Sequence, residues 1–293
     1  MKAKLINGRC ISSEIKLEVA NGVSDFKQEH RIAPGLAVIL VGEDPASTVY
    51  VRNKQSAAIE VGMVARDIHL ENDISQRDLL EQIEMINRDE RFHGVLVQLP
   101  LPSHIDKNDV IESINPDKDV DGLHPMNMGL LVEGRQRFVP ATPAGIQQML
   151  IRSGFNPDGK HVVVCGRSEI VGKPIAILLA QRMSGCNATV TVCHTGTNDL
   201  AGVTKQADIL VVAMGQPSFV TADMVKEQVV VIDVGVNRVE DSDRKNGYRL
   251  VGDVDFESVS GKAAAISPVP GGVGPMTIAM LLANTLKAAQ RLV

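Results

Sequence analysis

The first half of the chain alternates short apolar runs with amphipathic stretches. Residues 36–41, 64–70 and 94–98 are strand candidates, and the first of them (Leu-Ala-Val-Ile-Leu-Val) is apolar throughout. Apolar strands separated by helices are typical of a parallel sheet covered on both faces. The pattern therefore predicts a small parallel α/β domain, with ligands at the carboxyl ends of its strands.

Two helices are predicted between these strands. The first follows Asp44, an N-cap residue, has Pro45 at its first position, and ends near Gly62. The second follows Ser75 and has an apolar stripe at helical spacing. The stripe consists of Leu79, Leu80, Ile83 and Ile86.

The second half repeats this alternation on a larger scale. Thr142 and Pro143 predict the start of a connecting helix that runs to about Arg152. A last helix from Met276 or Thr277 has one apolar face, so we expect it to return to the first domain. Five further strands have the spacing of a doubly wound Rossmann sheet. They are predicted at residues 160–165, 189–192, 209–213, 229–233 and 263–266.

Composition narrows the class of protein. The 293 residues are 44% hydrophobic, and the net charge is −5. An acidic chain without a basic run does not fit a nucleic-acid or anionic-membrane surface, and no segment approaches membrane-spanning length. The four cysteines are scattered, which fits reduced thiols better than disulfides or a zinc site. We therefore expect a cytoplasmic α/β protein without a metal.

Tyr50 and Lys54 lie four residues apart in the first predicted helix, and therefore on one face. An amine whose pKa is lowered by burial exchanges protons near neutral pH, so the pair is a candidate for acid/base catalysis. Gln98 ends the third strand, where a ligand would bind. On spacing alone, a solvated lysine with the tyrosine packed against its stem is the alternative.

Residues 115–125 are dense in turn formers and acids, and include Asp121. This composition predicts an irregular loop. A solvated linker is one alternative. A calcium-binding loop is a weaker one, because the segment lacks the full EF-hand ligand series and its terminal glutamate.

A glycine-bounded turn, residues 166–172, joins the first strand of the second half to a predicted helix at 175–181. Glycine lets the backbone approach a nucleotide phosphate, and free N–H groups at the helix start face the anion, although the glycines do not follow GxGxxG. The next strand ends in Val-Cys-His-Thr (192–195), without the acid that binds the ribose of NAD. With Arg167 in the turn, we expect NADP; a surface cation is the alternative for Arg167.

Residues 267–275, Ser-Pro-Val-Pro-Gly-Gly-Val-Gly-Pro, form a stiff loop that lets a flat ligand lie against the backbone. A tight loop before a helix is the alternative. If the last helix returns to the first domain, this loop would lie at a cleft between two domains.

Together these segments resemble the bifunctional methylenetetrahydrofolate dehydrogenase/cyclohydrolases of folate one-carbon metabolism, nearly end to end. The motifs occur in the family's order, which is more specific than any one of them alone. They are Tyr-Val-Arg-Asn-Lys (50–54), Val-Gln-Leu-Pro-Leu-Pro (97–102), Asp-Val-Asp-Gly (119–122), Pro-Ala-Thr-Pro (140–143), Gly-Arg-Ser (166–168), Val-Ile-Asp-Val-Gly (231–235) and Pro-Val-Pro-Gly-Gly-Val-Gly-Pro (268–275).

The resemblance implies oxidation of methylenetetrahydrofolate by NADP⁺, followed by hydrolysis of the methenyl cation to 10-formyltetrahydrofolate. It implies that Lys54 transfers protons, that Gln98 holds its amine, that Tyr50 orients the folate, and that Asp121 binds the pteridine. Further substrate contacts are implied for Val97, Leu99, Pro270, Gly271, Gly272, Val273 and Gly274. Cofactor contacts are implied for Gly166, Arg167, Ser168, Thr195 and Ile232.

The resemblance also implies the domain plan. Residues 1–140 and 276–293 would form the folate-binding catalytic domain and residues 141–275 the NADP-binding Rossmann domain. The protein would be a homodimer, with the edge strand of the second domain as the candidate interface. A family member with one activity is a variant of this interpretation. The alternatives are another two-domain NADP-dependent dehydrogenase, similar to shikimate dehydrogenase, and a non-catalytic NADP-binding module.

Overall fold

The computed structural model describes residues 3–244 and 247–293, in two compact units. The six-stranded unit comprises residues up to Ser12 together with Thr142–Thr277, and the three-stranded unit comprises Ser13–Ala141 and Ile278–Val293. The division differs from the expected one at the start of the chain. Strand β1 (Lys4–Leu5) pairs with β11 (Ala265–Ile266), and such long-range backbone pairing has no local sequence signal.

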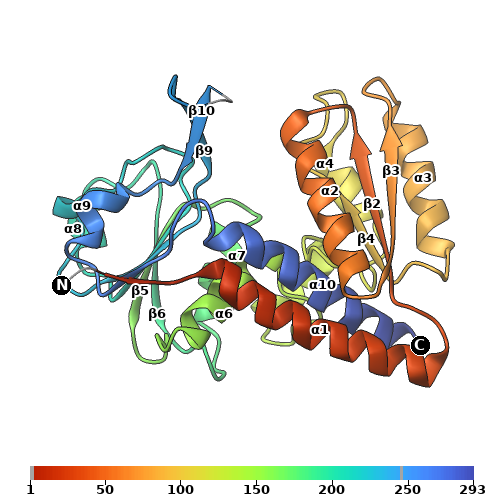
Figure 1. The fold of residues 1–293 in the computed structure, drawn as a ribbon, viewed down its shortest axis with the longest axis horizontal. Helices are drawn as coiled ribbons and strands as arrows, with labels where there is room; N and C mark the ends of the chain where they lie inside the picture. Colours follow the sequence, from red (N-terminus) through yellow and green to blue (C-terminus); the bar gives the residue numbers. More distant parts are fainter. Residues whose placement is uncertain (1–2, 245–246) are drawn as a thin grey trace. The chain divides into compact units, whose positions relative to one another are not determined.

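The three-stranded unit contains the predicted parallel sheet, in the order β3-β2-β4. Strand β2 is Gly35–Val41, β3 is Val64–Leu70 and β4 is Gly94–Val97. Figure 1 shows α2 (Pro45–Glu60) on one face of this sheet and α3 (Gln76–Arg88) on the other. The predicted fold class is confirmed.

One apolar core of this unit lies between the sheet and α3. Leu79, Ile83 and Ile86 of α3 are buried against the strands, whereas Leu80 is only partly buried. Val110 of α4 (Lys107–Ser113) belongs to the same apolar cluster. Helix α5 (Pro125–Val132) follows the acid-rich loop at residues 115–125, called the acidic loop below. The predicted stripe thus positions α3, and with it the carboxyl end of β4.

The six-stranded unit has a parallel sheet in the order β1-β11-β8-β7-β5-β6. Its apolar core gathers around Val163, Leu210 and Val231. The remaining strands of the sheet are β5 (His161–Cys165), β6 (Thr189–Cys193), β7 (Ile209–Val212) and β8 (Val230–Asp233), with a separate hairpin of β9 (Asn237–Glu240) and β10 (Tyr248–Val251). The short helices are α7 (Gly172–Leu179), α8 (Leu200–Thr204), the 3-10 turn η1 (Ala222–Met224) and α9 (Phe256–Ser260).

Three helices begin earlier than predicted. Helix α6 (Ala141–Arg152) already includes Thr142, whose hydroxyl contacts that of Thr277 at 2.9 Å instead of capping the helix. Helix α7 begins at Gly172, three residues before the predicted start. Helix α10 (Val273–Leu292) takes in part of the predicted Gly/Pro loop, because proline is well tolerated in a first turn.

The terminal helix returns to the three-stranded unit, as predicted. The amide of Asn284 in α10 donates hydrogen bonds to the carbonyls of Val120 (2.8 Å) and Val139 (3.0 Å). Helix α1 (Gly8–His30) was not predicted, although Ile15, Val19 and Val23 form a buried stripe at helical spacing.

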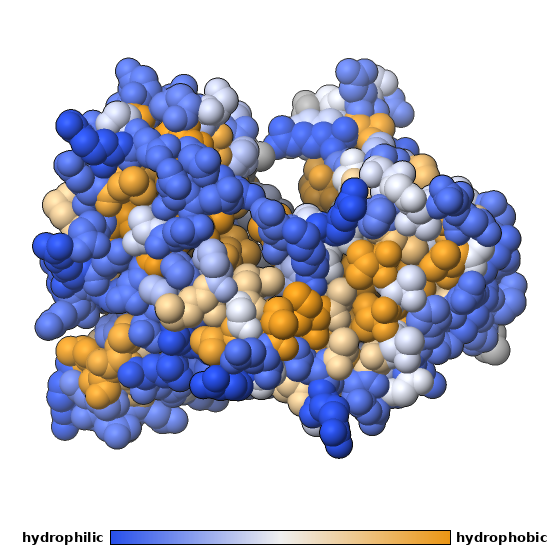
Figure 2. Space-filling view, turned by 180° about the vertical axis from the view of Figure 1, so that it is seen from behind, coloured by the Kyte–Doolittle hydropathy of each residue, from blue (hydrophilic) through white to orange (hydrophobic). Residues whose placement is uncertain are grey.

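The visible surface is mostly hydrophilic. On the face in Figure 2, groups of hydrophobic residues are interrupted by hydrophilic and intermediate ones. Within residues 3–244 and 247–293, no helix combines the length and the hydropathy that a membrane span requires.

Candidate active site

Helix α2 presents Lys54 as a buried amine. Asp44 caps the helix by accepting from the backbone N–H of Ser47 at 2.7 Å, with Pro45 at the first position, as predicted. Lys54 is 6% exposed, and its Nζ donates to Oε1 of Gln98 at 2.9 Å. Tyr50, one helical turn earlier, is 40% exposed. The structure therefore excludes a solvated lysine and leaves the phenol accessible to a ligand.

Hydrogen bonds fix both the backbone and the side chain of Gln98. It directly follows β4, and its backbone N–H donates to the carbonyl of Ile39 in β2 at 2.8 Å. Its side-chain amide donates to the carbonyl of Leu99 at 2.6 Å, which directs Oε1 toward Lys54. Because the strand end and the side chain are both fixed, Gln98 orients the amine rather than merely contacting it.

Lys54 and Asp121 influence each other's ionisation. Burial lowers the pKa of Lys54, and the negative charge of Asp121 opposes that shift. Burial raises the pKa of Asp121, the charge of Lys54 lowers it, and Asp119 raises it again. An amine with a lowered pKa beside a carboxyl group is suited to exchanging protons near neutral pH.

The acidic loop is ordered around Asp119, a residue that the sequence did not single out. Asp119 is 1% exposed, and its carboxylate accepts from the backbone N–H groups of Gly122 (3.1 Å), Leu123 (3.2 Å) and His124 (2.8 Å) and from the Asn127 amide (2.8 Å). The loop is thus neither a solvated linker nor a calcium loop at this position, since the carboxylate is occupied by N–H donors. It fixes the backbone on both sides of Asp121.

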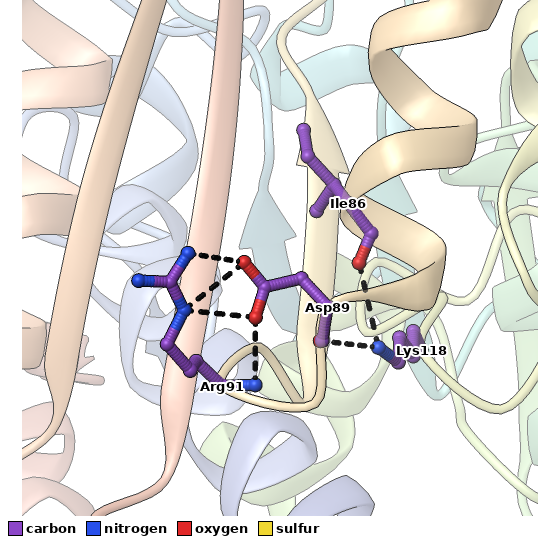
Figure 3. A network of polar contacts seen from close by, with 4 residues as sticks. All are labelled: Ile86, Asp89, Arg91 and Lys118. Atoms are coloured by element: carbon purple, nitrogen blue, oxygen red, sulfur yellow. Dashed lines mark hydrogen bonds and ion pairs between the residues drawn. The ribbon is translucent and has the colours of Figure 1, made fainter.

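A second anchor of this loop is Lys118 (Figure 3). Its Nζ donates to the backbone carbonyls of Asp89 (2.9 Å) and Ile86 (3.4 Å) at the end of α3. Asp89 in turn is bound by Arg91, which lowers the pKa of the Asp89 carboxyl to about 2. A cation on the last carbonyls of a helix is favourable, so Lys118 ties the acidic loop to α3.

The other predicted substrate residues divide between the units. Val97 packs into the core with α3, and Leu99 is partly buried. Pro270, Gly271 and Gly272 form a loop in the six-stranded unit, while Val273 and Gly274 open α10. Gly271 has φ +108°, a conformation that favours glycine, and its carbonyl accepts from the backbone N–H of Arg9 at 3.1 Å.

The six-stranded unit contains a pocket of about 250 Å³ at the carboxyl ends of β5, β6 and β7. This position, beside the point where the strand order reverses, is where doubly wound sheets bind nucleotides. The predicted residues Gly166, Arg167, Ser168 and Thr195 all line it, whereas Ile232 does not and is buried in β8. The lining residues not predicted are Cys165, Cys193, His194, Leu200, Ala213, Met214 and Gln216.

The glycine-bounded turn at residues 166–172, which was predicted to bind a phosphate and is called the phosphate turn below, differs from the prediction in one respect. The hydroxyl of Ser168 accepts from the N–H groups of Val171 (3.2 Å) and Gly172 (3.3 Å), and its carbonyl accepts from Lys173 (3.0 Å). These donors at the start of α7 are therefore not free for an anion. Arg167 is exposed on the pocket wall and supplies the positive charge.

The pocket fits NADP by the chemistry of its lining. Glycine and alanine backbones form one wall, and a Cβ at Gly166 would meet the carbonyl of Ala213 at 2.1 Å. The lining includes a guanidinium, an imidazole and two hydroxyls but no carboxylate, so a 2′-phosphate is not repelled. Within the described ranges, no three His, Cys, Asp or Glu side chains form a group that could hold a metal.

The fold and these two sites define an α/β protein with a pocket at the nucleotide-binding position of a doubly wound sheet and a buried lysine whose pKa is lowered. The sequence matches the profile "Tetrahydrofolate dehydrogenase/cyclohydrolase, catalytic domain" over residues 6–121 and the corresponding NAD(P)-binding domain over residues 140–293. The chain belongs to the tetrahydrofolate dehydrogenase/cyclohydrolase family.

Full-length relatives agree with this assignment. A protein named bifunctional protein FolD from Chloroherpeton thalassium is 54% identical over 97% of each chain. The crystal structure of FolD from Campylobacter jejuni is similar with a TM-score of 0.93 and 46% identity, over 99% of this chain and 100% of that one. The Trypanosoma brucei enzyme, complexed with NADP cofactor and inhibitor, has a TM-score of 0.94 and 40% identity, over 100% and 99% of the two chains.

Proposed function

We propose that this protein oxidises 5,10-methylenetetrahydrofolate to the 5,10-methenyl form with NADP⁺ and then hydrolyses that cation to 10-formyltetrahydrofolate. Family membership and the activities of relatives support both reactions, since the Campylobacter protein is a bifunctional methylenetetrahydrofolate dehydrogenase/cyclohydrolase. The observation in this chain that carries the proposal is the buried Lys54 amine, held by Gln98 at 2.9 Å.

Lys54 acts in the hydrolysis step. The neutral amine accepts a proton from water as the water oxygen bonds to the methenyl carbon. The resulting ammonium returns that proton to the ring nitrogen as the bond between this nitrogen and the carbon breaks, and the hydroxyl proton of the adduct leaves to solvent as the formyl C=O forms. Burial already lowers the pKa of Lys54, and a cationic substrate beside it lowers that pKa further. Gln98 orients the amine through its hydrogen bond. Over the whole cycle, Lys54 neither gains nor loses a proton.

Folate binding is assigned to residues around this lysine. Asp121 accepts from the aminopyrimidine edge of the pteridine, for which a carboxylate is a natural bidentate acceptor. The exposed ring of Tyr50 stacks on or orients the folate. Val97 acts through its backbone, because its side chain is in the core, and Leu99 contributes beside it. Pro270, Gly271, Gly272, Val273 and Gly274 are assigned further folate contacts through their backbone and small side chains.

Cofactor binding is assigned to the pocket of the six-stranded unit. When bound, NADP⁺ supplies the acceptor for the hydride from the methylene carbon. Arg167, Ser168 and Thr195 hold its phosphates and ribose, and Gly166 lets the backbone approach them. Ile232 acts through its main chain, since its side chain is fully buried. The protein's part in hydride transfer is positioning.

A two-wavelength assay tests the proposal. Purified protein is mixed with methylenetetrahydrofolate and NADP⁺, and NADPH and the methenyl chromophore are followed separately. We expect NADPH without methenyl accumulation in the wild type. Absence of NADPH with either nicotinamide cofactor would refute the dehydrogenase, and inhibition by shikimate rather than by a folate analogue would support the related two-domain dehydrogenase instead.

The domain roles, the assembly and the compartment are part of the same proposal. The three-stranded unit binds folate and the six-stranded unit binds NADP. The protein forms a homodimer, for which β6, an edge strand of the six-stranded sheet, is the candidate interface. A monomeric mass by light scattering would contradict the homodimer.

A cytoplasmic location is supported by the cysteines, none of which is in a disulfide.

A further inference from the structure

Asp253, which follows β10, has a fully buried side chain whose carboxylate accepts hydrogen bonds from three N–H donors. Its Oδ2 accepts from the backbone N–H groups of Met214 (2.6 Å) and Gly215 (2.9 Å). Its Oδ1 accepts from the side-chain amide of Asn237 at 2.8 Å. Burying a carboxylate costs free energy unless hydrogen bonds compensate the lost hydration, and these three hydrogen bonds supply that compensation.

The two backbone donors belong to the loop that follows β7. Met214 and Gln216 line the cofactor pocket, and Gly215 between them has φ +68°. A trans peptide points its N–H and C=O to opposite sides. Because the N–H groups of Met214 and Gly215 point at Asp253, the carbonyls of Ala213 and Met214 point away from it. The carbonyl of Ala213 accordingly packs against Gly166 in the phosphate turn.

Close packing keeps the carboxylate in this place. A Cβ at Gly235 would meet Oδ1 of Asp253 at 2.2 Å. The backbone N–H of Asp253 donates to Oδ1 of Asp233, at the end of β8, at 3.0 Å. A Cβ at Gly252 would meet Oδ2 of Asp233 at 1.7 Å. The Asp253 carboxylate therefore has little space to rotate toward other hydrogen-bond partners. It fixes the conformation of the loop after β7, residues 213–216, which is called the β7 loop below.

We propose that Asp253 is a positioning residue for the cofactor site: it clamps the backbone of Met214 and Gly215 so that the β7 loop and the phosphate turn together accept a nicotinamide dinucleotide. The proposal rests on the NADP-dependent function proposed above. Asp253 does not line the pocket, so it acts through Met214, Gly215 and the carbonyl of Ala213.

Two substitutions of Asp253 and one matched control test this role. Asp253→Leu removes the acceptor with a side chain of similar size, and Asp253→Asn keeps one oxygen for the two N–H donors but loses the charge. Asp255→Ala is the control. Asp255 lies two residues after Asp253 in the same unit, but its side chain caps α9 by accepting from the backbone N–H of Ser258. For each, NADP⁺ affinity is measured by calorimetry, kcat and KM for NADP⁺ by dehydrogenase assay, and methenyl hydrolysis without cofactor.

We expect Asp253→Leu to weaken NADP⁺ binding at least tenfold and Asp253→Asn about threefold, because charge-assisted hydrogen bonds are roughly twice as strong as neutral ones. KM for NADP⁺ should rise in parallel, while methenyl hydrolysis stays within twofold of wild type. Asp255→Ala should lower the unfolding temperature but leave the NADP⁺ affinity unchanged. A merely structural role would move both activities together.

The opposite results are equally clear. If Asp253→Leu weakens NADP⁺ no more than Asp255→Ala does, or if hydrolysis falls as much as cofactor affinity, the role is overturned. If Asp253→Leu does not yield folded protein, Asp253→Asn decides alone, and wild-type affinity in that variant overturns the proposal. Wild-type protein that binds NADP⁺ but oxidises no folate would refute the proposed substrate, while the calorimetry would still test Asp253.

Discussion

The amine of Lys54 and the side-chain oxygen of Gln98 lie 2.9 Å apart, although 44 residues separate them in the chain. One comes from the middle of α2 and the other from the end of β4. Because Gln98 is itself fixed by the carbonyls of Ile39 and Leu99, the direction of the Lys54 amine is set before any substrate binds.

Replacing Lys54 by methionine should abolish the hydrolysis. Loss of a general acid/base typically costs about 10²–10⁴-fold in rate, and methionine keeps the packing of the lysine stem. Methenyltetrahydrofolate should then accumulate while NADPH still forms, fully or at a reduced rate according to how far folate binding needs the amine. Arg52→Met, a substitution at an exposed cation on the same helix, is the control and should keep both activities. Methenyl hydrolysis at the wild-type rate in Lys54→Met would remove Lys54 from the mechanism.

The hydrolysis rate should rise with pH through a pKa below 10.5, the ordinary value for lysine. Burial lowers the pKa of Lys54, and the base is its neutral form, so protonation at lower pH switches the reaction off. The measurement is kcat/KM against pH, with the Lys54→Met rate subtracted as the uncatalysed reaction. A rate that does not change until pH 10.5 would contradict a perturbed amine.

The same shift has a consequence for stability. Between the lowered pKa of Lys54 in the folded state and 10.5 in the unfolded chain, the unfolded state binds more protons, so stability rises with pH in that window. Below it, the folded protein bears the cost of a buried charge. Urea unfolding of wild type and Lys54→Met should therefore show a difference at neutral pH that shrinks as the pH approaches 10.5.

Arg167→Ala should weaken NADP⁺ more than NAD⁺. The guanidinium lines a pocket whose lining residues include no carboxylate, and we propose that it binds the 2′-phosphate. We expect at least a tenfold loss for NADP⁺, about 1.4 kcal/mol, and a small one for NAD⁺. Lys173→Ala removes a nearby cation that does not line the pocket and serves as the control. Equal losses for both cofactors would show that Arg167 binds another part of the dinucleotide.

Asp119→Ala should destabilise the acidic loop and weaken folate binding. Three backbone N–H groups and the Asn127 amide lose their acceptor, which we expect to cost about 3 kcal/mol in the free energy of unfolding. Because Asp121 lies in the same loop, KM for the folate should rise severalfold. NADP⁺ affinity should not change, since the cofactor pocket is in the other unit. An unaltered KM would mean that Asp121 does not depend on Asp119.

Much of the fold could be predicted where local signals agree. In the three-stranded unit, Asp44 and Ser75 cap the two predicted helices, and the three predicted strand segments that alternate with these helices become β2, β3 and β4. Short-range capping chemistry and apolar periodicity are visible in the sequence itself. The first turn of α7 was misplaced because proline and glycine there suggested a loop.

What could not be predicted depends on partners distant in the chain. Lys118 and Asp253 look like ordinary loop residues, and their roles come from backbone groups that only the folded chain brings near. The backbone donors to Asp253 lie 38 and 39 residues upstream, and the acceptors of Lys118 lie 29 and 32 residues upstream. Helix α1 is different, because its buried stripe was present in the sequence and was overlooked.

Pairing of β1 with β11 has a consequence for how the chain is made. Lys4 lies opposite Ala265, so about 260 residues are synthesised between β1 and β11, its neighbour in the six-stranded sheet. At ribosomal rates of roughly 5–20 residues per second, that interval is about 13–50 s. During this time β1 exists without its hydrogen-bonding partner, so this edge of the six-stranded sheet forms only after β11 has been synthesised.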